Sequence, residues 1–319
     1  MQFIDLMFFT VANEYKSLRK IVNEASWEYN MPITKQGFNN RFSKESVEFT
    51  KQLLSQALAT QFRVDSFSLK CPLFKRILIK DSTRFDIDQS LKKNFPSYGG
   101  KTSPAGVSIQ LEYDIKDSRI LDLSINSALS RDSKDALSKK EDIKQGDLII
   151  RDLGYFHSDV LEQIYNQQAY YITRLHSNVK VFSTTKASEA IDFSAIFTQM
   201  KSSNISQTEM IIFIKDKKHL PMRLIIDLLP DEVYQKRLRL KNAANKNQGH
   251  KTSEEFKNRA RFNLFLTNIP QNEINTQEVC NLYRIRWQIE LVFKTWKSLI
   301  KISDLRKMSE ARLLTTIQM

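Results

Sequence analysis

The chain has 319 residues, 41% of them hydrophobic, which is enough for a packed core in one large domain or in two to three smaller ones. Lysine and arginine number 49 against 36 aspartate and glutamate, and the resulting net charge of +13 favours a polyanionic partner such as nucleic acid. The chain has two cysteines, Cys71 and Cys280, which are too few for a disulfide framework and lack the spacing of metal ligands. Its four histidines are scattered, which argues against a zinc site.

Residues 1–65 are predicted to form a helical domain, because their apolar residues recur at helical spacing without strand-like alternation. Helices are expected over about 6–25, 35–42 and 44–61, with Thr34 as the N-cap of the second. The basic, amide-rich second helix is similar to the recognition helix of a helix-turn-helix. A helical packing domain that does not bind DNA is the alternative.

The start of the chain has an acidic residue in its first apolar stretch and no basic region before it, which argues against a secretory signal. All apolar runs have the length of strands, so no membrane span is expected. We therefore expect a cytoplasmic protein.

Two buried strands are each predicted to end at an aspartate. Residues 74–80 form the first, followed by Asp81 in the run Asp-Ser-Thr-Arg; Asp86 and Asp88 are expected in a solvent-facing loop. The second covers 147–152 and ends in Asp152, where Gly154 permits a tight turn.

Other elements surround these two strands. Residues 107–115 and 119–125 alternate apolar with polar residues, which predicts an antiparallel hairpin with one solvated face. A helix over 159–165, capped by Ser158 or His157, and a strand over 169–175 follow the second aspartate.

Residues 176–269 are predicted to be a β-rich insertion with strands near 179–183, 210–215, 222–229 and 263–268. Within 236–262 the chain carries nine lysines and arginines against Glu254 and Glu255. A solvated helix–loop–helix is one interpretation, and a surface that contacts phosphates is favoured over it. The nine are residues 236, 237, 239, 241, 246, 251, 257, 259 and 261.

The stretch 281–297 is predicted to be one helix that carries chemistry on one face. At about 100° per residue, Tyr283, Arg286, Glu290 and Lys297 fall on one polar stripe. The opposite face is apolar and predicted to be core; it consists of Ile285, Ile289, Val292 and Trp296. The alternative is a surface helix with an Arg286–Glu290 ion pair.

The order Tyr-x2-Arg-x3-Glu-x6-Lys, together with Asp81-Ser-Thr and Asp152-x-Gly-Tyr-Phe, resembles the motifs of DDE-type bacterial insertion-sequence transposases, in the group named after insertion sequence four. The resemblance spans residues 74 to about 300. It implies an α/β fold with a mixed sheet, namely a ribonuclease-H-like catalytic core over 66–175 and 270–319 with the insertion at 176–269. It also implies that Asp81 and Asp152 meet at one sheet edge.

By this resemblance, Asp81, Asp152 and Glu290 are the catalytic residues and the metal ligands. Carboxylates without histidine or cysteine suit two Mg²⁺ ions, or Mn²⁺ as a substitute. The expected DNA-binding residues are Tyr283, Arg286, Lys297, Arg284, Lys294 and Trp287. For Trp287, stacking on an unpaired base and packing beside the site are both open.

The implied function is metal-dependent cleavage at insertion-sequence ends and strand transfer into target DNA. The implied partners are inverted-repeat and target DNA and a second copy in a synaptic homodimer, and the protein would associate with the nucleoid when bound. Because the sequence stops inside an apparently helical stretch, a truncated, inactive DNA-binding remnant is the alternative. A stand-alone structure-selective nuclease is a third hypothesis.

Overall fold

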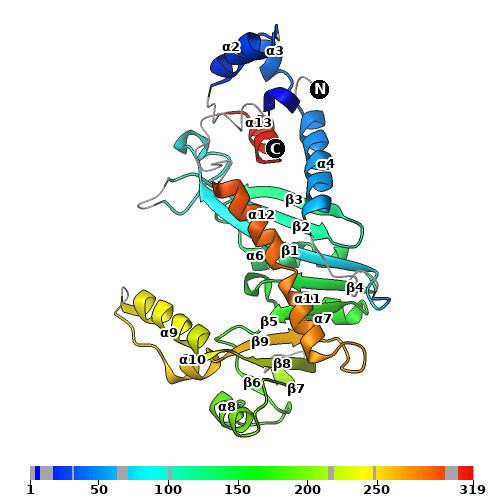
Figure 1. The fold of residues 1–319 in the computed structure, drawn as a ribbon, viewed down its shortest axis with the longest axis vertical. Coiled ribbons are helices and arrows are strands. Elements are labelled where there is room, and N and C mark those ends of the chain that lie inside the picture. Colours follow the sequence, from blue (N-terminus) through cyan, green and yellow to red (C-terminus); the bar gives the residue numbers. More distant parts are fainter. Residues whose placement is uncertain are drawn as a thin grey trace. The chain divides into compact units, whose positions relative to one another are not determined.

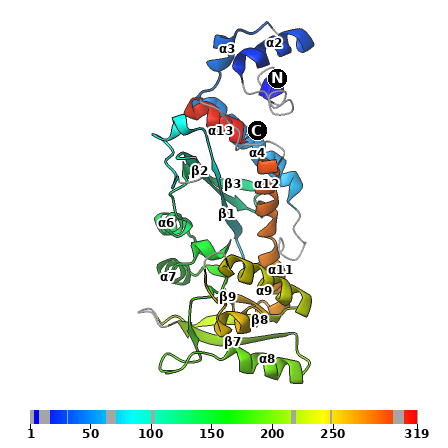
Figure 2. The same ribbon diagram turned by 90° about the vertical axis from the view of Figure 1, so that its left-hand side faces the viewer.

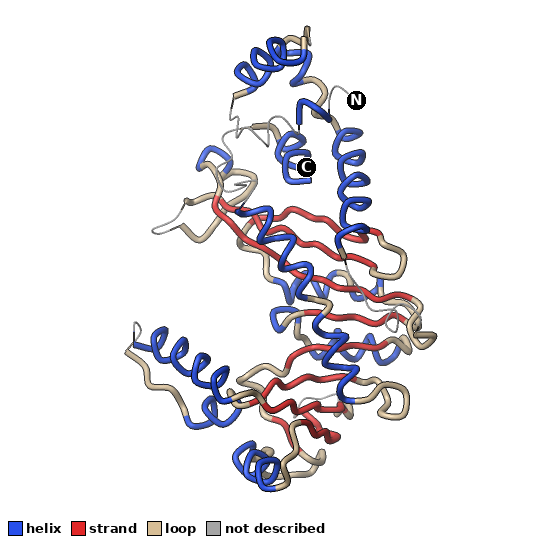
Figure 3. Tube along the Cα trace, in the orientation of Figure 1, coloured by secondary structure: helices blue, strands red, loops and turns tan. Residues whose placement is uncertain are grey.

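A computed structural model describes residues 4–7, 17–30, 32–62, 71–99, 103–214, 219–246, 249–298 and 308–318 (Figure 1). The chain divides into two compact units. Unit 1 comprises Met1–Lys70, Leu78–Arg131 and Arg286–Met319, and unit 2 comprises Cys71–Ile77 and Asp132–Ile285. Both units combine helices with strands (Figure 3), so the predicted α/β class is confirmed. None of the helices in the described ranges is long and apolar enough to cross a membrane.

The N-terminal part of unit 1 is helical, as predicted. Its helices are α2 (Leu18–Tyr29), α3 (Lys35–Asn39) and α4 (Lys44–Gln61). The Thr34 hydroxyl accepts a hydrogen bond from the Gly37 amide at 2.9 Å, which confirms the predicted cap. Part of the first predicted helix, residues 8–16, lies outside the described residues. A small apolar core that includes Ile21, Ala25 and Phe38 joins α2 to α3.

Helix α4 packs on two other elements of unit 1. It lies beside α13 (Glu310–Gln318) (Figure 2). The Thr50 hydroxyl donates to Gln318 Oε1 at 2.6 Å. At its other end, the Ile120 amide donates to the Ser55 hydroxyl at 3.1 Å. Thus α4 is bound to the sheet of unit 1. The predicted domain of residues 1–65 stays a prediction.

Replacing Thr50 by valine should lower the free energy of unfolding by about 1–2 kcal/mol, because it leaves the buried Gln318 amide without its hydrogen-bond donor. Urea unfolding measures this change. Thr60→Val is the matched control on the same helix: its hydroxyl is exposed and bonds only within α4 in the described contacts, so we expect a change under about 0.5 kcal/mol. Equal losses in both variants would contradict the prediction.

The sheet of unit 1 has the order β3-β2-β1 and is antiparallel throughout. Strand β1 (Arg76–Asp86) is longer than predicted, so Asp81 lies in mid-strand rather than at its end. The prediction that Asp86 and Asp88 lie in a loop is wrong for Asp86, the last residue of β1, whereas Asp88 caps a 3-10 turn. The polar sequence stays extended because residues 81–86 pair with residues 106–111 of the next strand.

The predicted hairpin is confirmed as β2 (Gly106–Asp114) and β3 (Arg119–Ser127), but its solvated face is wrong for β2. Every residue of β2 is buried. On the polar side, the fully buried Lys80 ammonium of β1 lies 3.6 Å from Glu112 of β2 and 3.1 Å from Asp122 of β3. Polar side chains are tolerated there because opposite charges are paired across the strands.

Unit 2 contains a second run of strands in the order β4-β5-β9-β8-β7-β6, of which β4 and β5 are parallel and the others antiparallel. The four strands predicted for the insertion are present as β6 to β9. They extend the sheet beyond β5, with β9 paired to β5. The strands are β4 (Asp147–Arg151), β5 (Tyr170–Arg174), β6 (Val181–Phe182), β7 (Gln207–Ile214), β8 (Met222–Leu228) and β9 (Phe262–Thr267). The helices are α6 (Asp132–Ser138), α7 (Ser158–Asn166), α8 (Phe193–Ser202), α9 (Asp231–Lys246), α10 (Glu254–Arg259) and α11 (Thr276–Arg284).

Candidate active site

The predicted signature helix is two helices, α11 in unit 2 and α12 (Trp287–Ser298) in unit 1. The prediction of one continuous helix is therefore wrong at Ile285 and Arg286, which form a turn. The amides of Ile285 and Ile289 each bond three residues back, to Leu282 and Arg286, at 3.1 Å. Such tightened turns occur where side-chain contacts outweigh helix propensity. Here Tyr283, before the turn, and Arg286, within it, each make side-chain contacts with distant residues.

On the α11 side, Tyr283 is buried within unit 2. Its ring packs on Phe265 with centroids 4.8 Å apart, and its hydroxyl donates to Asp152 Oδ1 at 3.3 Å. Asp152 directly follows β4, where the sequence placed it, and immediately precedes the 3-10 turn Leu153–Tyr155. The signature tyrosine and the second predicted aspartate are thus in contact.

On the α12 side, Arg286 joins two predicted carboxylates within unit 1. Its Nη1 donates to Asp81 Oδ2 at 2.9 Å, and its Nη2 donates to Glu290 Oε1. The Arg286 side chain is only 9% exposed, and the Ser82 amide holds the other Asp81 oxygen at 2.8 Å. Residues from β1 and α12, far apart in sequence, therefore converge on one buried guanidinium.

The remaining faces of α12 follow the predicted periodicity. Ile289, Val292 and Trp296 are buried, and so is Ile285 in the preceding turn, which confirms the core face. Trp287 is 57% exposed, which favours stacking on a base over packing beside the site, and its role stays a prediction. Arg284, Lys294 and Lys297 are exposed at their ends, and partial desolvation lowers the pKa of the Lys297 ammonium.

The donor set of unit 1 fits a hard cation. Asp81 and Glu290 offer carboxylate oxygens to one positive group, the Arg286 guanidinium, and such oxygens are the ligands that Mg²⁺ and Mn²⁺ prefer. Among the residues that the structure describes, no three or more His, Cys, Asp or Glu side chains form a group that could hold a metal ion. Coordination by Asp81, Asp152 and Glu290 stays a prediction.

The basic segment of the insertion separates into structural arginines and exposed cations. Arg237 donates to the Phe262 carbonyl at 2.8 Å, Arg259 donates to the Val179 carbonyl at 2.8 Å, and Arg261 stacks on the rings of Phe197 and Tyr234. The side chains of five others face solvent: Lys236, Arg239, Lys241, Lys246 and Lys251. The ninth, Lys257, is paired with Glu254 at 2.5 Å, so the five exposed side chains are the ones best suited to contact phosphates.

The alternatives for His157 are also resolved. Its Nδ1 accepts from the Asp159 amide at 3.2 Å, which makes it the N-cap of α7, as one alternative stated. Sequence reasoning missed Arg223 and Glu209, which form a buried ion pair in unit 2. Their only signal was that charges interrupt otherwise apolar strands.

Comparison with known proteins shows the family of the chain. The family model described as "Transposase DDE domain" matches residues 72–319, and the chain belongs to this family. It is 33% identical over 299 residues to the transposase of insertion sequence element IS231F from Bacillus thuringiensis subsp. israelensis, covering 88% of this chain and 62% of that protein. It is 30% identical to the IS1151 transposase of Clostridium perfringens, covering 89% and 63%.

A shorter match joins the chain to the putative transposase InsL of IS186A from Escherichia coli strain K12, at 38% identity over 87 residues, which are 27% of this chain and 23% of that protein. The chain thus spans about three fifths of the IS231 and IS1151 transposases it resembles, at 62% and 63% of their lengths.

Proposed function

We propose that this chain carries the catalytic centre of an insertion-sequence transposase of the insertion-sequence-four group, with Asp81, Asp152 and Glu290 as the catalytic carboxylates. The reaction is metal-dependent strand cleavage at insertion-sequence ends followed by strand transfer into target DNA. The convergence of Asp81 and Glu290 on Arg286 is the observation that carries this proposal. Family membership and the named relatives support it independently.

Each signature residue has a role in this proposal. Tyr283 holds Asp152 through its hydroxyl, and Arg286 keeps Asp81 and Glu290 oriented until substrate arrives. Two Mg²⁺ ions, with Mn²⁺ as a substitute, would when bound activate a water or a 3′-hydroxyl and stabilise the leaving oxygen. Lys297 contacts a neighbouring phosphate, with three further DNA contacts from Arg284, Lys294 and Trp287.

The DNA partner is favoured by the net charge of +13 and by the exposed cations of the insertion. Lys236, Arg239 and Lys246 recur along one side of α9, so a single duplex backbone can contact all three. Assembly of two copies on paired transposon ends, and association with the nucleoid when bound, belong to the same proposal.

Replacing Lys236, Arg239 and Lys246 together by glutamine should weaken DNA binding almost equally for all sequences. If each contacts one phosphate, the slope of log K against log salt concentration falls by about 0.9 per residue. Fluorescence anisotropy with a labelled duplex at several salt concentrations measures this slope. Lys186 is an exposed lysine on a loop of unit 2, so Lys186→Gln is the control and should leave the slope unchanged. An unchanged slope in the triple variant would remove α9 from the DNA surface.

The function itself is tested by incubating the protein with Mg²⁺ and a labelled duplex that ends in the inverted repeat flanking its gene. Cleavage at the repeat boundary supports the transposase. Binding without cleavage favours the inactive remnant, and cleavage that ignores the repeat favours a structure-selective nuclease. Omission of Mg²⁺ with added chelator is the control for metal dependence.

A further inference from the structure

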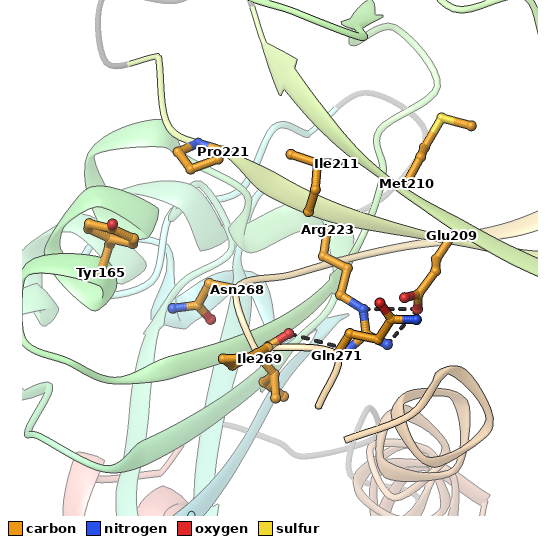
Figure 4. A pocket seen from close by; sticks show the side chains of 10 residues that line it. Tyr165, Glu209, Met210, Ile211, Pro221, Arg223, Asn268, Ile269 and Gln271 are labelled. Atoms are coloured by element: carbon orange, nitrogen blue, oxygen red, sulfur yellow. Dashed lines mark hydrogen bonds and ion pairs between the residues drawn. The ribbon is translucent and has the colours of Figure 1, made fainter. Parts of the chain in front are cut away.

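Arg223, the second residue of β8, is the centre of a buried hydrogen-bond network within unit 2 (Figure 4). Its side chain is 5% exposed, and its Nε and Nη2 lie 2.9 Å and 2.5 Å from Oε2 of Glu209 on β7. The two residues are diagonal neighbours across the ladder, within reach of long side chains. A pocket of about 380 Å³ opens beside them.

The same network extends to the loop that leads into α11. Arg223 Nη1 donates to the backbone carbonyls of Ile269 at 3.2 Å and Ile274 at 2.7 Å. Glu209 Oε2 also accepts from the hydroxyl of Thr276, the first residue of α11, at 2.9 Å. The loop 268–275 and the first turn of α11 are therefore tied to β7 and β8 by the side chains of Arg223 and Glu209.

Helix α11 transmits this attachment to the candidate site. Tyr283 lies seven residues after Thr276, about 10 Å along the helix axis, and its hydroxyl reaches Asp152. The Asn275–Glu278 capping box rigidifies the helix start between them. A shift of the first turn therefore displaces the Tyr283 hydroxyl by a similar amount.

We infer that Arg223 and Glu209 are positioning residues that set the placement of α11 and, through it, of Tyr283 against Asp152. The inference rests on the proposed function for its catalytic meaning. A buried ion pair by itself adds little to stability relative to well-packed apolar residues. Apolar residues could fill this space, but they could not hold two loop carbonyls and the Thr276 hydroxyl in fixed directions.

The first test does not depend on catalysis. In Arg223→Lys, which keeps the charge but loses the planar fork, hydrogen exchange of the α11 amides from residue 279 to residue 283 should accelerate at least tenfold, with α7 amides unchanged. Should this variant fail to fold, Thr276→Val, which removes one bond to Glu209, should show a smaller acceleration of the same amides. Unchanged exchange in α11, or equal acceleration in both helices, would overturn the inference.

The second test uses the repeat-end cleavage assay. Arg223→Lys should slow cleavage on the order of tenfold to a hundredfold, the size of effect expected from a displacement near 1 Å. Combined with Tyr283→Phe, it should add almost nothing to the loss that Tyr283→Phe causes alone, because both act through one hydroxyl.

Arg76→Lys is the matched control, since Arg76 also forms a buried bidentate pair, with Asp147 at 2.7 Å and 2.5 Å in unit 2. The loss of cleavage rate in Arg76→Lys should add to the loss in Tyr283→Phe when the two are combined. If the losses in Arg223→Lys and Tyr283→Phe also added, Arg223 would have a purely structural role. If the wild-type protein cleaves no DNA, the proposed function fails, and the exchange measurement still decides whether Arg223 positions α11.

Discussion

Replacing Glu290 by glutamine is expected to reduce cleavage at the repeat boundary by about a thousandfold or more, with little change in DNA affinity. A metal ion at a phosphoryl centre contributes several kcal/mol to transition-state stabilisation, and each 1.36 kcal/mol is about tenfold in rate. The amide keeps the shape of the side chain but removes the charge that a divalent cation needs. Single-turnover cleavage of a labelled repeat end in saturating Mg²⁺ measures the loss.

Asp81→Asn and Asp152→Asn should show losses of similar size, since the proposal gives all three carboxylates one role. Asp86→Asn is the matched control. Asp86 is half-buried at the end of the same strand as Asp81 and has no role in the proposal, so this variant should cleave within about twofold of wild type. If Asp86→Asn proved as damaging as Asp81→Asn, the choice of first aspartate would be wrong. Full activity in Glu290→Gln would refute the proposed site.

Arg286→Met is expected to lower the free energy of unfolding by about 2–4 kcal/mol. Breaking a buried ion pair from one side costs about 3–5 kcal/mol because a charge stays buried without its partner; here the value is reduced because the Glu290 side chain is 35% exposed. Asp81, at 15%, carries most of the cost. Urea unfolding followed by circular dichroism measures the change.

A double-mutant cycle separates this charge effect from packing. In a Glu290→Gln background, Arg286→Met should cost less, because one of the two carboxylates is already neutral. Arg284→Met makes the same substitution two residues earlier on an exposed side chain and should change stability by under about 0.5 kcal/mol. Equal costs in both backgrounds would mean that the Arg286–Glu290 pair adds nothing to stability and that the cost comes from Asp81 and from packing.

Most local structure was predictable because it depends on short-range patterns. The Thr34 cap, the β2–β3 hairpin, strand β4 ending before Asp152 and the His157 cap each follow from a few neighbouring residues. The apolar face of α12 likewise follows from spacing alone, and its members are buried. Local hydrogen bonds and side-chain periodicity dominate such elements, so no distant partner is needed to predict them.

The errors occur where a distant partner outweighs the local pattern. Strand β1 continues through a polar stretch because residues of β2 complete its hydrogen bonds. The polar face of β2 is buried because Lys80 compensates the carboxylates of neighbouring strands. The signature helix breaks at Ile285 and Arg286 because contacts on either side hold different residues, Tyr283 to Asp152 and Arg286 to Asp81.

The sequence by itself determined the types and order of most elements, the candidate carboxylates and the signature residues, since these depend on residue chemistry and spacing. Only the tertiary structure decided that Arg286 joins Asp81 to Glu290, that three of the nine basic residues of the insertion are structural, and that Arg223 ties β8 to the start of α11. Apart from the Arg286–Glu290 pair within one helical turn, such contacts join residues tens to hundreds of positions apart. They depend on how strands and helices pack, which no local pattern encodes.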